Sequence, residues 1–113
     1  MTVGRKAFLS GGVMIHQFCR IGAVVIVSGL TGIRKDIIPY TVAAGDPARH
    51  YRLNIVGVRR SGVRGERFRA LSDAFLRLRT RAGLDQLPAT PEVDHLRDWL
   101  AAPSKRGVTG FAR

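Results

Sequence analysis

Branched aliphatic residues recur at every sixth position over the first third of the chain. Six consecutive hexads open on Val3, Leu9, Ile15, Ile21, Val27 and Ile33. Their fifth positions hold small or β-branched residues: Ala7, Val13, Cys19, Val25, Thr31 and Ile37. A helix repeats its apolar residues every three or four positions and a strand every two, so a period of six fits neither alone. It is typical of a left-handed parallel β-helix, in which each hexad forms one side of a triangular coil and its first residue points inward.

The hexad period stops after residue 38, and the pattern then changes twice. Residues 39–49 contain glycine, aspartate and proline and are predicted to be a loop that leaves the coils. Thr90 and Pro91 are favourable first residues for a helix near the C-terminus. Another amphipathic helix is predicted within residues 64–82, where apolar residues follow a spacing of three or four: Phe68, Leu71, Phe75 and Leu78.

The predicted fold class is therefore β-helix plus α. Three hexads make a coil, so residues 1–48 should form two coils of left-handed parallel β-helix. Residues 49–113 should form a small α-helical C-terminal domain. Coils of this kind need about three stacked neighbours to bury their apolar faces, and two coils fall short of that number.

The chain carries a net charge of +11, and the excess is concentrated. Residues 49–81 contain ten arginines against two acids, Glu66 and Asp73. Such a field favours an anionic partner, which could be nucleic acid, a phospholipid surface, a nucleotide-linked substrate or an acidic carrier protein. Charge alone does not choose among them.

Other chemical signals are few. Cys19 is the only cysteine, which excludes an internal disulfide, and its place in a hexad predicts a buried apolar role. Phosphate-loop, zinc-protease and serine-hydrolase motifs are absent, so neither a metal nor a cofactor is expected. No apolar run approaches the ~18 residues needed to span a bilayer, and no signal-peptide pattern is present, so a cytoplasmic protein without a membrane span is expected. His50 and His95 have no supporting neighbours and are predicted to face solvent.

Four segments of the sequence resemble one acyltransferase family. They are GGVMIHQFCRIGA at 11–23, PYTVAAGDPAR at 39–49, LNIVGVRRSG at 53–62 and SKRG at 104–107. Together they resemble the C-terminal portion of the acyl-carrier-protein:UDP-N-acetylglucosamine O-acyltransferases, hexapeptide-repeat enzymes of lipid A biosynthesis. The resemblance implies a homotrimer with sites between neighbouring β-helices. It also implies transfer of a 3-hydroxyacyl group from acyl carrier protein to the sugar 3-hydroxyl of UDP-N-acetylglucosamine.

The same resemblance assigns binding residues but no catalytic residue. His16 and Gln17 match a pair that lies along the acceptor and acyl-chain site, Asn54 and Arg60 match positions that contact the nucleotide-sugar, and Gly29 matches the position that sets acyl-chain length. The histidine that acts as general base in the family stands upstream of the matched residues. Whether this chain is itself an enzyme is therefore left open.

Three positions depart from the family pattern. Val24 replaces a usual histidine, Val56 stands where some members have glutamate, and Ser61 stands where a second arginine is common. These changes should weaken nucleotide binding first.

Two hypotheses follow. In the first, the chain is a truncated family member that assembles as a homotrimer or with a chain carrying the missing coils, because an uncapped β-edge invites pairing. In the second, it is a non-catalytic basic binding or assembly module for an anionic partner. Nucleic acid is not expected as a partner, because Tyr51 is the only aromatic residue of the basic stretch outside the predicted helix core.

Overall fold

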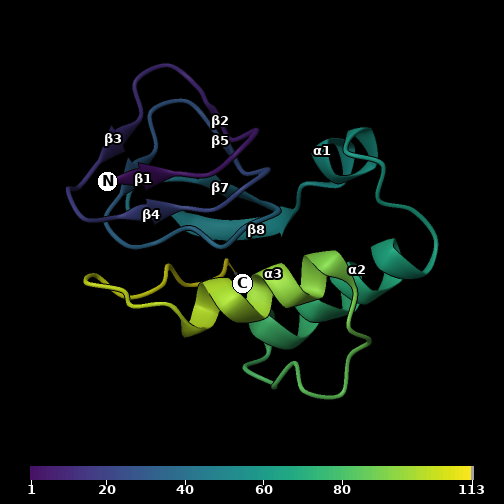
Figure 1. The fold of residues 1–113 in the computed structure, drawn as a ribbon. Helices are drawn as coiled ribbons and strands as arrows, with labels where there is room; N and C mark the ends of the chain where they lie inside the picture. Colours follow the sequence, from purple (N-terminus) through teal and green to yellow (C-terminus); the bar gives the residue numbers. More distant parts are fainter. Residues whose placement is uncertain (113) are drawn as a thin grey trace.

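The computed structural model describes residues 1–112, in which short strands come first and helices follow (Figure 1). None of the helices in this range is both long and apolar enough to cross a membrane. The elements are β1 (Thr2–Val3), β2 (Phe8–Leu9), β3 (Met14–Ile15), β4 (Arg20–Ile21), β5 (Ile26–Val27), β6 (Gly32–Ile33), β7 (Thr41–Ala44), β8 (Arg49–Leu53), α1 (Ile55–Arg60), α2 (Glu66–Arg79) and α3 (Pro91–Ala101).

The first six strands pair in parallel, each with the strand three hexads further along. Thr2 lies opposite Arg20 in β1 and β4, Phe8 opposite Ile26 in β2 and β5, and Met14 opposite Gly32 in β3 and β6. The pairs belong to three separate sheets. This register is the one that a coil of three hexads predicts, because equivalent positions of successive coils stack.

The fourth position of each of the first five hexads adopts a positive φ. Glycine occupies one of these positions, and the other four are Lys6, Phe18, Val24 and Leu30. These turns stack in register and define three corners of the coil. We call residues 5–6 and 23–24 the first corner, 11–12 and 29–30 the second, and 17–18 and 35–36 the third. The backbone hydrogen bonds from Val24 N to Arg5 O (2.8 Å) and from Leu30 N to Gly11 O (3.0 Å) hold the first two together.

The second coil is packed internally and the first is partly open. Ile21, Val27 and Ile33 are almost fully buried, as is Cys19, whose predicted burial is confirmed. The equivalent residues of the first coil, Val3 and Leu9, are 46% and 36% exposed. They lie on strands that pair on one side only within the described residues, which accounts for their exposure.

The predicted loop at residues 39–49 is wrong in its centre, which forms β7. This strand continues the stack, since Val42 lies opposite Ile26 of β5. The chain takes 16 residues from Ile26 to its partner Val42, two fewer than the 18 from Phe8 to Ile26. The hexad period is therefore lost here, although the strands still stack. β7 also pairs antiparallel with β8, Thr41 opposite Leu53, so hydrogen bonding runs across the boundary expected at residue 48.

Helices α2 and α3 lie side by side along one side of the strands, and α1 stands beyond the end of β8 (Figure 1). The two predicted helices are present as α2 and α3, whereas α1 was not predicted. Thr90 caps α3 as expected, its Oγ1 accepting a hydrogen bond from Val93 N at 3.2 Å. Buried residues from the helices and the β-helix share one apolar cluster, which includes Val24, Ile38, Tyr40, Leu53, Leu71, Phe75, Val93 and Leu96.

The C-terminal segment 104–112 returns to the β-helix through a buried carboxylate. Asp36 is fully buried and accepts hydrogen bonds from Arg20 Nε (2.8 Å) and Ser104 Oγ (2.6 Å). Backbone bridges join Asp36 to Val108 and His50 to Phe111. These contacts fix residues 108–111 against the strands, where they form one wall of a cavity described below.

Candidate functional site

The residues that the sequence assigns to substrate binding lie at three different corners of the coil. His16 and Gln17 are exposed at the third corner, and Gly29 is exposed at the second. Asn54 caps the start of α1 and Arg60 is its last residue. This helix lies against the first corner, where Asn54 Nδ2 donates a hydrogen bond to Val24 O at 2.8 Å. One copy of the chain therefore does not bring these five residues into a common site.

Asn54 has a structural role that the sequence analysis missed. Its side chain is 4% exposed, and its Oδ1 accepts a hydrogen bond from Gly57 N at 3.1 Å, which caps the start of α1. Gly57 packs so closely on this side chain that a Cβ there would collide with it. Asparagine directly before an apolar turn is a recognised helix-start signal, so this role was readable from the sequence. Asn54 fixes the orientation of α1 and thereby of Arg60.

Positive charge gathers around α1 at the first corner. Arg59 and Arg60 form its last turn, and Arg59 stacks over the ring of Phe68 at 5.1 Å. Lys6 lies beside them, its Nζ donating to Ser61 Oγ at 3.4 Å. Among residues 1–112, the Arg60 side chain makes neither a hydrogen bond nor an ion pair, so its planar guanidinium is free to bind a phosphate oxygen pair.

His16 is held by an arginine from the C-terminal segment. Its Nδ1 lies 3.1 Å from Nη2 of Arg106, and Arg106 Nε donates to Arg34 O at 2.7 Å. Because a guanidinium donates hydrogen bonds and accepts none, Nδ1 of His16 must be the unprotonated nitrogen. The imidazole then carries its proton on Nε2 and presents a donor outward. The motif SKRG marks this segment in the sequence, but nothing in it predicted the contact with His16.

Gly29 leaves the outer face of the second corner uncovered. A Cβ there would lie 3.4 Å from Gly11 O, an ordinary contact, and its φ is not in the left-handed region. Within the described chain, packing therefore does not require a glycine at this position. The neighbouring Leu30 is 81% exposed, so this corner presents an apolar surface beside an open position.

The prediction that His50 faces solvent is wrong, because its side chain is 1% exposed. It points inward from β8, where its Nε2 accepts a hydrogen bond from Ile38 N at 3.0 Å and its ring lies 4.9 Å from that of Phe111. Burial lowers the pKa of His50 to about 4, so the ring is neutral at pH 7. The prediction is confirmed for His95, which is exposed at the edge of the Tyr40 ring.

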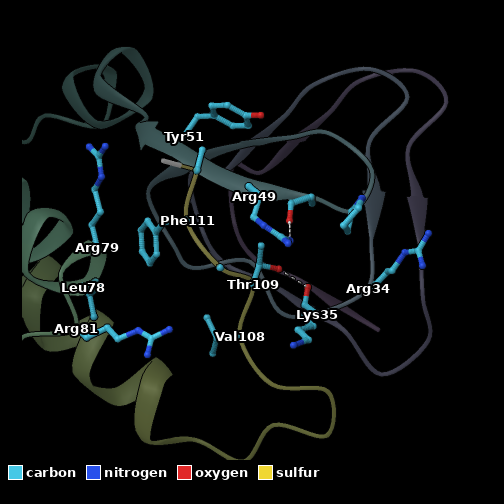
Figure 2. A pocket seen from close by; sticks show the side chains of 14 residues that line it. Arg34, Lys35, Arg49, Tyr51, Leu78, Arg79, Arg81, Val108, Thr109 and Phe111 are labelled. Atoms are coloured by element: carbon cyan, nitrogen blue, oxygen red, sulfur yellow. Dashed lines mark hydrogen bonds between the residues drawn. The ribbon is translucent and has the colours of Figure 1, made fainter.

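One cavity among residues 1–112 has a volume of about 1300 Å³ and contains none of the predicted site residues. It lies between β8, the C-terminal end of α2 and residues 108–112. Its basic side chains come from three segments of the chain (Figure 2): Arg34, Lys35, Arg49, Arg79 and Arg81. Tyr51, Leu78, Val108 and Phe111 supply apolar and aromatic surface.

Comparison with known proteins identifies close similarity to one enzyme family. Residues 36–109 match the model of domain 2 of UDP-N-acetylglucosamine O-acyltransferase. An acyl-carrier-protein:UDP-N-acetylglucosamine O-acyltransferase from Alkalilimnicola ehrlichii is 37% identical, with 96% of this chain and 45% of that protein covered. One from Gloeothece citriformis is 36% identical, with 84% and 37% covered. The chain thus spans less than half the length of the curated relatives it matches.

Solved structures give the same result. A UDP-N-acetylglucosamine acyltransferase from Bacteroides fragilis superposes with a TM-score of 0.81 at 32% identity, covering 94% of this chain and 45% of that one. The homologous structure from Acinetobacter baumannii gives 0.80 at 30% identity, covering 95% and 45%. The sequence match and the shared fold agree along almost the whole chain, which therefore belongs to the UDP-N-acetylglucosamine O-acyltransferase family and corresponds to its C-terminal portion.

Proposed function

We propose that this chain supplies the substrate-binding part of a site that transfers a 3-hydroxyacyl group from acyl carrier protein to UDP-N-acetylglucosamine, the opening step of lipid A synthesis. Family membership supports the reaction, and the curated relatives carry both substrates in their names. We also propose that residues 1–48 form two regular left-handed coils and that residues 49–113 form a helical domain. We also place the reaction in the cytoplasm, which the free buried thiol of Cys19 suits.

The observation that carries the proposal is the separation of the predicted residues over three corners of the coil. A substrate that contacts both Arg60 at the first corner and His16 at the third must lie between two β-helices. We infer that the chain acts as a homotrimer or in association with a chain that carries further coils. In that assembly, one copy presents α1 to the third corner of its neighbour.

The individual roles follow from the local chemistry. Arg60 binds the diphosphate with its planar fork, and Asn54 holds α1 in place for that contact. His16 donates through Nε2 and Gln17 donates or accepts through its amide, which suits sugar hydroxyls or the acyl 3-hydroxyl. Gly29 leaves the second corner open to the acyl chain.

The proposed acyl transfer needs catalytic groups other than the five predicted binding residues. Acyl transfer requires a base that takes the proton of the sugar hydroxyl and a donor that stabilises the oxyanion. None of the five predicted binding residues is assigned either role. The proposed chain therefore binds and orients the substrates, while the base comes from coils that the match does not cover.

A chimera tests this proposal. The chain would be joined behind the N-terminal part of the Alkalilimnicola relative that it does not match, and acyl transfer would be followed by mass spectrometry with light scattering on the same sample. Turnover by a trimer, reduced by Arg60→Gln but unchanged by Arg69→Gln on α2, is expected. A folded trimer that neither binds UDP-N-acetylglucosamine nor turns over would refute the proposal.

A further inference from the structure

The cavity between β8 and the end of α2 is a basic groove, and most of its charge is not paired with an acid within residues 1–112. We define it by the five basic residues that line it, Arg34, Lys35, Arg49, Arg79 and Arg81. No aspartate or glutamate is among its lining residues. Arg34 pairs with Asp46 outside the groove at 3.0 Å, whereas the other four make no ion pair within residues 1–112.

Other arginines of the chain do form ion pairs, unlike the arginines of the groove other than Arg34. Arg20 pairs with Asp36, Arg67 with Glu92 and Arg97 with Asp94. Asp36, Asp46, Glu92 and Asp94 thus form ion pairs away from the groove, and no acid among residues 1–112 lines it. Like charges gathered in a concave surface repel one another and focus a positive potential, which an anion would relieve. The positive potential in this groove therefore favours the binding of an anionic ligand.

The charges stand on opposite sides of the groove. Figure 2 shows Arg79 and Arg81 at one side, Arg34 at the other, and Arg49 and Lys35 between them. Arg49 is steadied by a hydrogen bond from its Nη1 to Ala48 O at 2.9 Å. Guanidinium groups bind phosphate oxygens in pairs. Arg49, Arg79 and Arg81 make no ion pair within residues 1–112 and offer such contacts from two segments of the chain.

The groove also contains surface that is not charged. Phe111 is held against His50 and Phe75, and Tyr51 on β8 is half-exposed at the rim. Leu78 and Val108 add aliphatic contacts. A purely inorganic ion would leave these side chains unused, so the ligand should carry an apolar or aromatic portion beside its phosphates.

We propose that this groove is a second ligand site, distinct from the proposed acyl-transfer site, that binds a molecule bearing two phosphate groups or a diphosphate together with an apolar portion. The wall formed by residues 108–111 is fixed by the bridges to Asp36 and His50, so the site is already shaped in the free chain. It contains none of the predicted acyl-transfer residues. A soluble phosphorylated metabolite and a phospholipid headgroup share this chemistry.

Titration calorimetry with inorganic pyrophosphate tests the proposal on the full chain. The double variant Arg79→Gln/Arg81→Gln should weaken binding about tenfold or more, since it removes charge-assisted hydrogen bonds. The matched control Arg64→Gln/Arg69→Gln removes the same charge from exposed positions and should change affinity less than about twofold. Arg60 is proposed to bind a diphosphate as well, so Arg60→Gln should lower the pyrophosphate affinity that remains in the groove variant, and this second, separate loss distinguishes the groove from the proposed acyl-transfer site.

Further arms identify the source of the phosphate. Vesicles of phosphatidylcholine with phosphatidylglycerol should bind, and be displaced by pyrophosphate, if a headgroup is the natural ligand; binding of pyrophosphate without vesicle binding points to a soluble molecule. Either result supports phosphate recognition. The proposal is overturned if neither probe binds, if the control variant loses as much affinity as the groove variant, or if polyglutamate of equal charge competes better than pyrophosphate. Circular dichroism confirms that each variant is folded.

Discussion

Burial of His50 should make the stability of this chain fall between pH 7 and pH 5. The histidine is neutral in the fold, where Nε2 accepts the Ile38 N–H, and its pKa drops from the ordinary 6.5 to about 4. A histidine whose pKa is lowered on folding contributes stability above its unfolded pKa. Below about pH 6.5 this histidine takes up a proton in the unfolded chain but not in the folded one, so the contribution is lost as the pH falls. The loss is complete near pH 4, where His50 also takes up a proton in the folded chain.

The size of the effect follows from the two pKa values. Each pKa unit corresponds to about 1.4 kcal/mol, so the full loss is about 3 kcal/mol, of which about 2 kcal/mol falls between pH 7 and pH 5. This is a large share of the stability of a small domain. Carboxylates with ordinary pKa values titrate mainly below this window, so the slope reports chiefly on histidine.

Urea unfolding at pH 7, 6 and 5 would measure the effect. The variant His50→Gln keeps an acceptor for the Ile38 N–H but does not titrate, so its stability should be nearly flat over this range even if it is lower at pH 7. The control His95→Gln, at an exposed position, should keep the slope of the parent chain. An equal slope in the parent chain and in His50→Gln would refute the reasoning, as would an NMR titration of His50 in the folded chain near pH 6.5.

Three further predictions concern contacts around the proposed site. Asp36→Asn should destabilise the chain by about 3 kcal/mol in urea, because it leaves a buried charge network unpaired. Asp46→Asn, at an exposed pair, should cost less than about 1 kcal/mol, and similar losses would contradict the account. Asn54→Ala should lower stability by about 1 kcal/mol and weaken UDP-N-acetylglucosamine binding by chimeric trimers; unchanged binding would argue against α1 positioning. Arg106→Ala should lower the share of the Nε2–H tautomer of His16 to that of a free imidazole, which already favours this tautomer, measured by imidazole ¹⁵N shifts at neutral pH, and an unaltered share would show that the contact is not formed in solution.

The parallel pairing was predictable because the information that specifies it is local. Each hexad carries its own inward residue, and equivalent positions must stack, so the period alone gives the register of β1 to β6. Helices α2 and α3 were predictable for a similar reason, from apolar spacing and the Thr90 cap. The family motifs then identified candidate binding residues, but they did not predict that these residues lie at three different corners.

The features that were missed depend on contacts between distant segments. β7 closes a turn two residues shorter than a regular coil, so no hexad marks it. His50 is buried by the alternation of β8 and by Phe111, which lies far along the chain. The basic groove draws on four segments that meet only after folding, and its arginines look like any charged surface in the sequence.

The central claim is that substrate contacts come from different copies of the chain, and mixing two variants of the chimera tests it directly. Arg60→Gln impairs the first corner and His16→Ala the third, so each variant alone should be a weak acyltransferase. Co-assembled in equal amounts, they should regain activity in about a quarter of the sites, because those sites pair an intact first corner from one copy with an intact third corner from its neighbour. Mixed trimers that show no more activity than the separate variants would place both residues in one copy's site and contradict the account.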